Sequence, residues 1–184
     1  MDLLVESLRQ RSLRVQERAM LALSSDRIDA GANPDFPLCA LNEIALLKDD
    51  TSSMITVDTT IDGRELTQYR ADGLIVSTAT GSTGYNMSAG GPLLQPTLDA
   101  AVITPVAPHS LTLRPLVVDA SSVLRARTHS RSGKYRVSID GNSFILPSGT
   151  EVEIRRAPYR LRVLIPADTD FAATLRRKLR WGSF

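Results

Sequence analysis

Short apolar segments separated by turn residues run along most of the chain, and this pattern predicts a protein built mainly from β-strands. Apolar and polar residues alternate over 54–61 and again over 134–140, where Tyr135, Val137 and Ile139 share one face. Further strands are expected over 13–23, 38–47, 66–70, 74–76, 100–106, 111–118, 122–128, 144–146, 151–154 and 159–165. About ten short strands with closely spaced turn signals favour a β-sandwich.

Turn residues indicate how these strands are connected. Asp62-Gly63 predicts a hairpin turn, and residues 140–142 predict another. Residues 122–128 and 134–140 are expected to pair with each other around the turn at 130–133. Pro115 makes 111–118 an edge strand or a broken strand. Residues 24–37 are expected to form a loop and 48–53 a polar turn.

Helices are predicted in three places. One covers 2–11, and a short one lies in the segment that Gly90-Gly91-Pro92 ends. The last covers 170–180, where Phe171, Leu175 and Leu179 form an apolar stripe.

Length and composition favour one domain over residues 1–184. Apolar residues make up 42% of the 184 residues, which is typical of a globular protein with a full core. A net charge of +2 gives no reason to expect nucleic acid as a partner. Cys39 is the single cysteine, so an intramolecular disulfide is impossible and a reducing, cytoplasmic compartment is expected. No apolar stretch approaches membrane-spanning length, so no membrane association is expected.

The stretch from Asp72 to Pro92 is the most distinctive part of the sequence. The buried strand Leu74-Ile75-Val76 leads into glycine and hydroxyl residues from Ser77 to Gly84, followed by residues compatible with a helix. Such a loop at a helix N-terminus presents free backbone N–H groups and hydroxyls, which can hold a nucleotide. An ordinary strand-turn-helix connection explains the composition equally well, because neither a Walker A motif nor G-x-G-x-x-G is present.

The polar pair Asn42-Glu43 interrupts the apolar segment 38–47. Burying a carboxylate is costly unless it is hydrogen-bonded or paired. A ribose diol offers two O–H donors that a carboxylate accepts well. The alternative is an internal hydrogen-bond pair that fixes a strand end, and the residues alone favour that alternative.

These motifs together resemble the signature of the NAD kinases, which use ATP to phosphorylate NAD to NADP. The resemblance is carried by Asp-Gly-Leu-Ile-Val-Ser-Thr-Ala-Thr-Gly-Ser-Thr-Gly-Tyr over 72–85, followed by Ser88-Ala-Gly-Gly-Pro. Leu41-Asn42-Glu43-Ile44, the block 103–115 and the segment 171–182 are similar to further family motifs in the same order. The resemblance covers about residue 13 to the end, and the combination of these motifs is specific.

The resemblance implies the fold and a set of NAD contacts. The C-terminal domain of the NAD kinases is a β-sandwich, in agreement with the strand pattern of this sequence. The resemblance places the adenosine ribose at Asn42 and Glu43, and adenine with its ribose against the segment from Thr83 to Ser88. The substrate-binding residues carried over by position are Asn42, Glu43, Arg70, Asp72, Thr80, Thr83, Gly84, Tyr85, Asn86, Met87, Ser88, Ala107 and Asn142.

Two positions depart from the family pattern. The family usually has alanine at Gly84, and many relatives have a basic residue where this chain has Ser52-Ser53.

Arg70 is expected to pair with Asp72 or with a phosphate. His109 is expected to have a structural role near Arg114. Without the resemblance, Asp140-Gly141-Asn142 is a hairpin turn.

The resemblance also implies what is absent. The family's Gly-Gly-Asp-Gly motif, whose aspartate is its general base, does not occur in this sequence. The chain is therefore expected to be a C-terminal piece without kinase activity, with no catalytic residue and no metal ligand of its own. Its helix at 169–180 is expected to pack toward the absent N-terminal α/β domain. ATP with magnesium would serve the complete enzyme, and a homo-oligomer is expected.

Two other classes of function compete with this interpretation. Lipid kinases of the diacylglycerol or sphingosine class share the two-domain plan, although Asn42-Glu43 and the motif at 80–85 argue against them. A β-sandwich interaction module without enzymatic activity is the third possibility, and binding of NAD or NADP would argue against it.

Overall fold

The computed structural model describes residues 2–10, 12–28, 38–50 and 53–181. The chain divides into two compact units, Ala19–Arg160 and the pair of segments Met1–Arg18 and Leu161–Phe184. Each unit is described by itself. The expected turn at 48–53 and the expected loop at 24–37 both fall partly outside the described residues.

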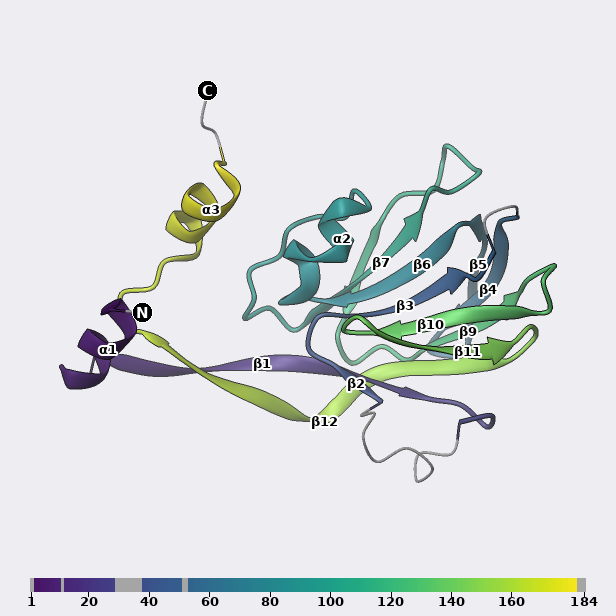
Figure 1. Cartoon of the computed structure of the whole chain (residues 1–184). Coiled ribbons are helices and arrows are strands. Elements are labelled where there is room, and N and C mark those ends of the chain that lie inside the picture. Colours follow the sequence, from purple (N-terminus) through teal and green to yellow (C-terminus); the bar gives the residue numbers. More distant parts are fainter. Residues whose placement is uncertain (1, 11, 29–37, 51–52, 182–184) are drawn as a thin grey trace. The chain divides into compact units, whose positions relative to one another are not determined.

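Two six-stranded antiparallel sheets form the larger unit, as the strand pattern predicted (Figure 1). Sheet A contains, in spatial order, β2 (Cys39–Ala40), β1 (Leu13–Ser24), β12 (Glu151–Pro166), β9 (Leu124–His129), β4 (Ile55–Ile61) and β5 (Arg64–Ala71). Sheet B contains β11 (Asn142–Pro147), β10 (Lys134–Ile139), β3 (Glu43–Lys48), β6 (Gly73–Thr78), β7 (Ala100–Val106) and β8 (Leu116–Asp119). Strands β1 and β12 continue into the smaller unit.

The inner faces of the two sheets share one hydrophobic core. Strand β9 contributes Leu124 and Ala126 and turns Arg125 and Arg127 outward, which is the alternation of a half-buried strand. From sheet B, Ile44, Leu46, Leu74, Val76, Ile103, Tyr135 and Val137 pack into the same core. The fold is therefore the expected mainly-β sandwich.

Strand β6 differs from the outer strands because all of its residues are buried. The short helices η1 (Gly81–Thr83) and α2 (Tyr85–Ser88) follow β6 and lie beside β6 and β7 (Figure 1). The Thr104 hydroxyl of β7 donates to Asn86 Oδ1 of α2 at 2.6 Å, which fixes α2 against sheet B. Because β6 is buried on both faces, its sequence is a short continuous apolar run without alternation.

The smaller unit contains helices α1 (Asp2–Arg9) and α3 (Phe171–Leu179), close to their predicted bounds. Asp170 caps α3 by accepting the N–H groups of Ala172 and Ala173 at 3.2 and 2.9 Å. No residue of α3 is buried. Among the residues that the structure describes, no helix is both long enough and apolar enough to cross a membrane.

Three strand assignments were wrong in their partners or bounds. The segments predicted as a hairpin, 122–128 and 134–140, lie in different sheets: β9 pairs with β4 and β12, and β10 pairs with β3 and β11. The single strand predicted over 38–47 is divided into β2 in sheet A and β3 in sheet B. Alternation shows which face of a strand is buried, but it does not identify the neighbouring strand.

The remaining differences concern strand length. The strand predicted over 111–118 covers only Leu116–Asp119, because Pro115 comes directly before it and cannot donate to a ladder. It does lie at the edge of sheet B, as Pro115 indicated. The two last strands, predicted over 151–154 and 159–165, form one continuous strand, β12.

Candidate functional site

The candidate site lies where the chain crosses from sheet A to sheet B, at Leu41 and Asn42. The loop that follows β6 is fixed against this crossing by hydrogen bonds from Thr78. Its N–H donates to Asn42 O at 2.9 Å, and its hydroxyl donates to Leu41 O at 2.6 Å. The same hydroxyl accepts the N–H of Gly81 at 3.0 Å. The glycine-hydroxyl loop and the Asn42-Glu43 pair, predicted separately, therefore lie together.

Gly81 is the point of closest approach between the two segments. A Cβ added at Gly81 would lie 2.1 Å from Asn42 O and 2.6 Å from Asn42 Cα. No side chain fits at those distances, so glycine is required by the approach of one backbone to another.

Glu43 begins β3 and pairs in register with Ser77 of β6. Its Oε2 atom is buried and has no hydrogen-bond partner among the described residues. Burial raises the pKa of the Glu43 carboxyl above its usual range, the charge of Asp140 raises it further, and a backbone hydrogen bond from Tyr85 opposes them. A buried carboxylate oxygen without a donor is costly, so this atom is suited to accept a hydrogen bond from a ligand.

Gly84 lies close against the Glu43 carboxylate and the backbone of Gly81. A Cβ at position 84 would lie 3.2 Å from Glu43 Oε2 and 3.2 Å from Gly81 O. The Thr80 hydroxyl, at the start of the same loop, is also buried and without a partner among the described residues. Thr80 therefore does not cap η1 through its side chain, and two unsatisfied polar groups flank the loop.

The residues of the loop and of α2 divide into exposed and buried ones. Thr83, Gly84, Tyr85, Met87 and Ser88 are exposed and therefore accessible to a ligand. Asn86 is fully buried, and its Nδ2 donates to Ser82 O and to Pro92 O, both at 3.0 Å. Because every polar atom of the Asn86 side chain has a partner within the fold, its contribution here is to hold α2 in place.

Asp140 was interpreted from the sequence only as a turn residue, and its contacts exceed that role. Its Oδ2 accepts the N–H of Leu41 at 2.7 Å, and its Oδ1 accepts those of Asn42 and Glu43 at 2.8 and 3.0 Å. The only signal in the sequence was a carboxylate in a turn close to a predicted site residue, Asn142. Asn142 itself is exposed at the start of β11, two residues beyond Asp140.

Arg70, Asp72 and Ala107 lie at the other end of the β3–β6–β7 ladder. Gly73 begins β6 and Thr78 ends it, so the two ends are separated by about 17 Å at 3.3 Å per residue. Asp72 forms an ion pair with Lys48 at 2.9 Å, and not with Arg70. Ala107 adopts a positive φ of 45°, which is uncommon for a residue other than glycine. The predicted contacts thus form two groups that one chain does not bring together.

Arg70 belongs to β5 of sheet A, whereas Lys48, the partner of Asp72, belongs to β3 of sheet B. Arg70 lines a cavity of about 500 Å³ together with Thr56, His129 and Arg131. The carbonyl of Arg70 accepts the N–H of His109 at 2.9 Å. The guanidinium of Arg114 donates to backbone carbonyls of Leu111 and Leu113, and no bond between it and His109 is found in the described part of the chain.

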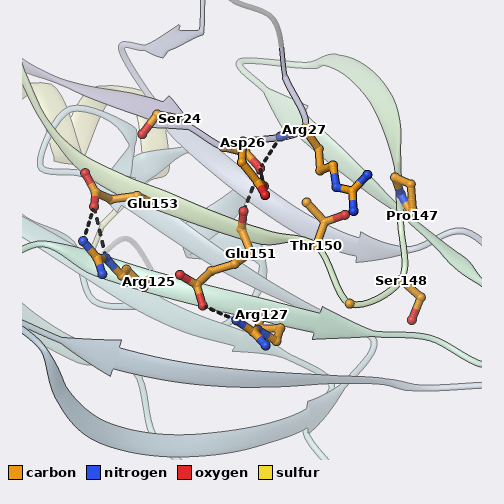
Figure 2. Close-up of a pocket in the computed structure, with 12 residues that line it drawn as sticks. Ser24, Asp26, Arg27, Arg125, Arg127, Pro147, Ser148, Thr150, Glu151 and Glu153 are labelled. Atoms are coloured by element: carbon orange, nitrogen blue, oxygen red, sulfur yellow. Dashed lines mark hydrogen bonds and ion pairs between the residues drawn. The ribbon is translucent and has the colours of Figure 1, made fainter.

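A cavity of about 620 Å³ lies beside β9 and β12, and none of the predicted site residues lines it (Figure 2). Its charges neutralise each other: Arg125 pairs with Glu153 at 3.0 Å and Arg127 with Glu151 at 3.1 Å. These exposed cross-strand pairs stabilise a sheet surface weakly. We take the surroundings of Glu43 as the candidate site because its Oε2 atom is buried without a partner among the described residues.

Metal ligands are not gathered anywhere in the described part of the chain. No group of three or more histidine, cysteine, aspartate or glutamate side chains there could hold a metal ion. Cys39 is half-buried, and its sulfur accepts the hydroxyl of Tyr159 at 2.7 Å.

The fold and this site define a class: an antiparallel β-sandwich domain whose glycine- and hydroxyl-rich loop lies against a buried carboxylate. The chain belongs to the ATP-NAD kinase C-terminal domain family, whose sequence model matches residues 41–165. This confirms the resemblance that the motifs carried.

Curated relatives and solved structures agree with the family. The chain is 42% identical over 178 residues to "NAD kinase" of Christiangramia forsetii, covering 97% of this chain and 60% of that protein. It is 43% identical to "NAD kinase" of Bacteroides fragilis over 183 residues, covering 100% of this chain and 62% of that protein. This chain therefore spans about three fifths of the length of the curated relatives it matches.

Two solved structures are similar over almost the whole chain. Yeast NADH kinase complexed with NADH superimposes with a TM-score of 0.85 at 26% identity, covering 100% of this chain and 53% of that one. An NAD kinase from Archaeoglobus fulgidus in complex with ATP gives a TM-score of 0.74 at 28% identity, covering 97% and 65%.

Proposed function

We propose that this chain is the substrate-binding part of an NAD kinase, which phosphorylates the 2′-hydroxyl of the adenosine ribose of NAD with ATP. The relatives named NAD kinase, and the similar structures complexed with NADH and with ATP, support this proposal. The observation that carries it is the buried Glu43 Oε2 atom without a hydrogen-bond partner among the described residues, next to the exposed Gly84.

In the proposed complex, Glu43 accepts hydrogen bonds from the ribose hydroxyls. Two O–H donors match a carboxylate, and they would satisfy the atom that the fold leaves without a partner. Thr80 supplies a second buried polar contact. The exposed side chains of Tyr85 and Met87 offer apolar area for adenine, since both protrude from α2.

Catalysis by the complete enzyme would consist of positioning and charge stabilisation. The general base and the ATP site are assigned to the part of the relatives that this chain does not cover. Magnesium would enter with ATP, since the described residues gather no group of metal ligands. The apolar stripe of α3, none of which is buried, is proposed to pack against that remaining part.

Arg70, Asp72 and Ala107 are proposed to complete the site of a second copy of the chain. Their distance from Glu43 along β6 makes a shared contact with one ribose impossible within one chain. A two-fold contact between two copies of the chain could bring the Asp72 end of sheet B in one copy to the Glu43 end of sheet B in the other. The edge strand β8, with Leu116 and Val117 exposed, offers apolar surface for such a contact.

A binding experiment with this chain tests the role of Glu43. Isothermal titration calorimetry with NAD and NADP is compared for the parent chain, Glu43→Gln and the control Glu65→Gln, which lies on an exposed position of β5. Glu43→Gln should weaken binding more than about tenfold, because a hydrogen bond to a charged group contributes about 1.5–3 kcal/mol. Equal affinity of both variants, with a lower melting temperature for Glu43→Gln, would assign Glu43 to the fold alone.

A kinetic experiment tests the division of labour. With NAD and Mg-ATP, a coupled assay for NADPH formation should detect no turnover by this chain. Robust turnover would place the general base within residues 1–184 and contradict this assignment.

A further inference from the structure

Two hairpin turns of the chain have the same sequence and nearly the same backbone. Asp62-Gly63 joins β4 to β5, and Asp140-Gly141 joins β10 to β11. The aspartates have φ values of 51° and 47°, and the glycines 77° and 86°. Positive φ at both central residues is the requirement of a tight hairpin turn, and asparagine meets it as well as aspartate does.

The two aspartates differ in what their carboxylates hold. Asp62 Oδ1 accepts one N–H, from Val123 at 2.8 Å. Asp140 accepts three consecutive N–H groups, those of Leu41, Asn42 and Glu43. The N–H of Asp140 also donates to Glu43 O at 3.1 Å, so both backbone polar groups of Glu43 are bonded to this one residue.

The N–H groups that Asp140 accepts belong to the segment that connects the two sheets. Between β2 and β3 the chain leaves one sheet and enters the other, so its N–H groups are not in a ladder there. Buried or half-buried N–H groups need acceptors, and a side chain supplies them here. Because Asp140 holds both the N–H and the carbonyl of Glu43, it also fixes the direction of the Cα–Cβ bond from which the Glu43 side chain extends.

We propose that Asp140 is a positioning residue of the ligand site, which holds Glu43 in front of Gly84 through the backbone of residues 41–43. The inference rests on the proposed function in one respect, that Glu43 contacts the ligand. A turn residue alone would need only its positive φ, whereas the three accepted N–H groups need the carboxylate. Asp140 also places its negative charge close to Glu43.

The test compares Asp140→Asn with the matched control Asp62→Asn. Asparagine keeps the turn conformation in both cases but has only one acceptor oxygen. Three properties are measured: the melting temperature, the affinity for NADP by calorimetry, and the pKa of Glu43 from its side-chain carboxyl NMR signal. We expect both variants to lose some stability. Only Asp140→Asn should weaken NADP binding, by about tenfold or more, and lower the pKa of Glu43.

Unchanged NADP affinity together with an unchanged Glu43 titration in folded Asp140→Asn would overturn the proposal. Similar changes in both variants would also overturn it, because they would reflect stability alone. If the parent chain binds neither NAD nor NADP, the proposed function fails for this chain. Positioning is still decided in that case by the Glu43 titration and by amide exchange at residues 41–43. If Asp140→Asn does not fold, Asp140→Gly, which adopts positive φ without strain, replaces it.

Discussion

Gly81→Ala places a methyl group where the loop after β6 meets the crossing between the sheets. The added Cβ would lie 2.1 Å from the oxygen, 2.4 Å from the carbonyl carbon and 2.6 Å from the Cα of Asn42. All three atoms belong to the backbone, so no side chain can rotate away. The N–H of Thr78 holds that same carbonyl at 2.9 Å, so Asn42 cannot retreat without losing this bond.

The expected loss of stability follows from these contacts. Overpacking costs about 1–3 kcal/mol, and the bonds from Thr78 N to Asn42 O and from Gly81 N to Thr78 Oγ1 contribute about 1 kcal/mol each. If both bonds break, Gly81→Ala lowers the free energy of unfolding by about 3–5 kcal/mol. For a protein of ordinary stability, this is a large fraction of the total.

Urea denaturation followed by circular dichroism measures this change, and Gly84→Ala is the matched control. Position 84 belongs to the same loop, but its added Cβ would approach no atom closer than 3.2 Å. Gly84→Ala should therefore cost about 1 kcal/mol or less. If Gly81→Ala unfolds within about 0.5 kcal/mol of the parent chain, the close approach of the two backbones is refuted.

Four further predictions concern other contacts. Asn86→Ala removes three buried hydrogen bonds, including that from Thr104, and should lower the free energy of unfolding by about 2–4 kcal/mol in the same urea assay. A loss no larger than that of a substitution at an exposed position would contradict the role of Asn86 in holding α2. The pKa of Glu43 is raised, so on acidification the affinity for NADP should begin to fall at a higher pH than it would with an ordinary glutamate. Calorimetry across a range of pH measures this dependence, and Glu43→Gln should abolish it. The same raised pKa means that the stability contributed by Glu43 is complete below its unfolded pKa and is lost as the pH rises through the folded one. Val117→Arg should dissociate an oligomer in sedimentation equilibrium without unfolding the chain, since Val117 is 46% exposed, whereas Leu113→Arg should unfold it because Leu113 packs against the core.

The sequence predicted which segments are strands better than it predicted their partners. Alternation in β4, β9 and β10 is a local property, since it depends on one buried and one exposed face. The assignment of β9 and β10 to different sheets depends on where the chain turns in space, which a four-residue connection does not reveal. The same limit explains β2 and β3, which looked like one apolar strand because both are buried on a sheet face.

The candidate site could be predicted in part. Glu43 stood out as a carboxylate within an apolar segment, although the residues alone favoured an internal hydrogen-bond pair. The composition of the glycine-hydroxyl loop fitted an ordinary connection equally well, and only the resemblance to the NAD kinases singled out both. Asp140 was missed because an Asp-Gly turn already accounts for its sequence, and its bonds to residues 41–43 span almost one hundred positions. The separation of Asp72 from Glu43 follows from the length and direction of β6, which a list of contact residues does not contain.

The electrostatics of the Glu43 end restrict which part of a nucleotide could bind there. Two carboxylates, those of Glu43 and Asp140, lie close enough for one to raise the pKa of the other. A phosphate group at this position would meet like charges in a half-buried setting, which costs free energy. Sugar hydroxyls carry no charge and donate the bonds that Glu43 Oε2 lacks. In the proposed NAD complex, a ribose therefore faces Glu43 while the pyrophosphate lies farther away, and this orientation leaves a ribose hydroxyl, the proposed acceptor of the phosphoryl group, beside the site.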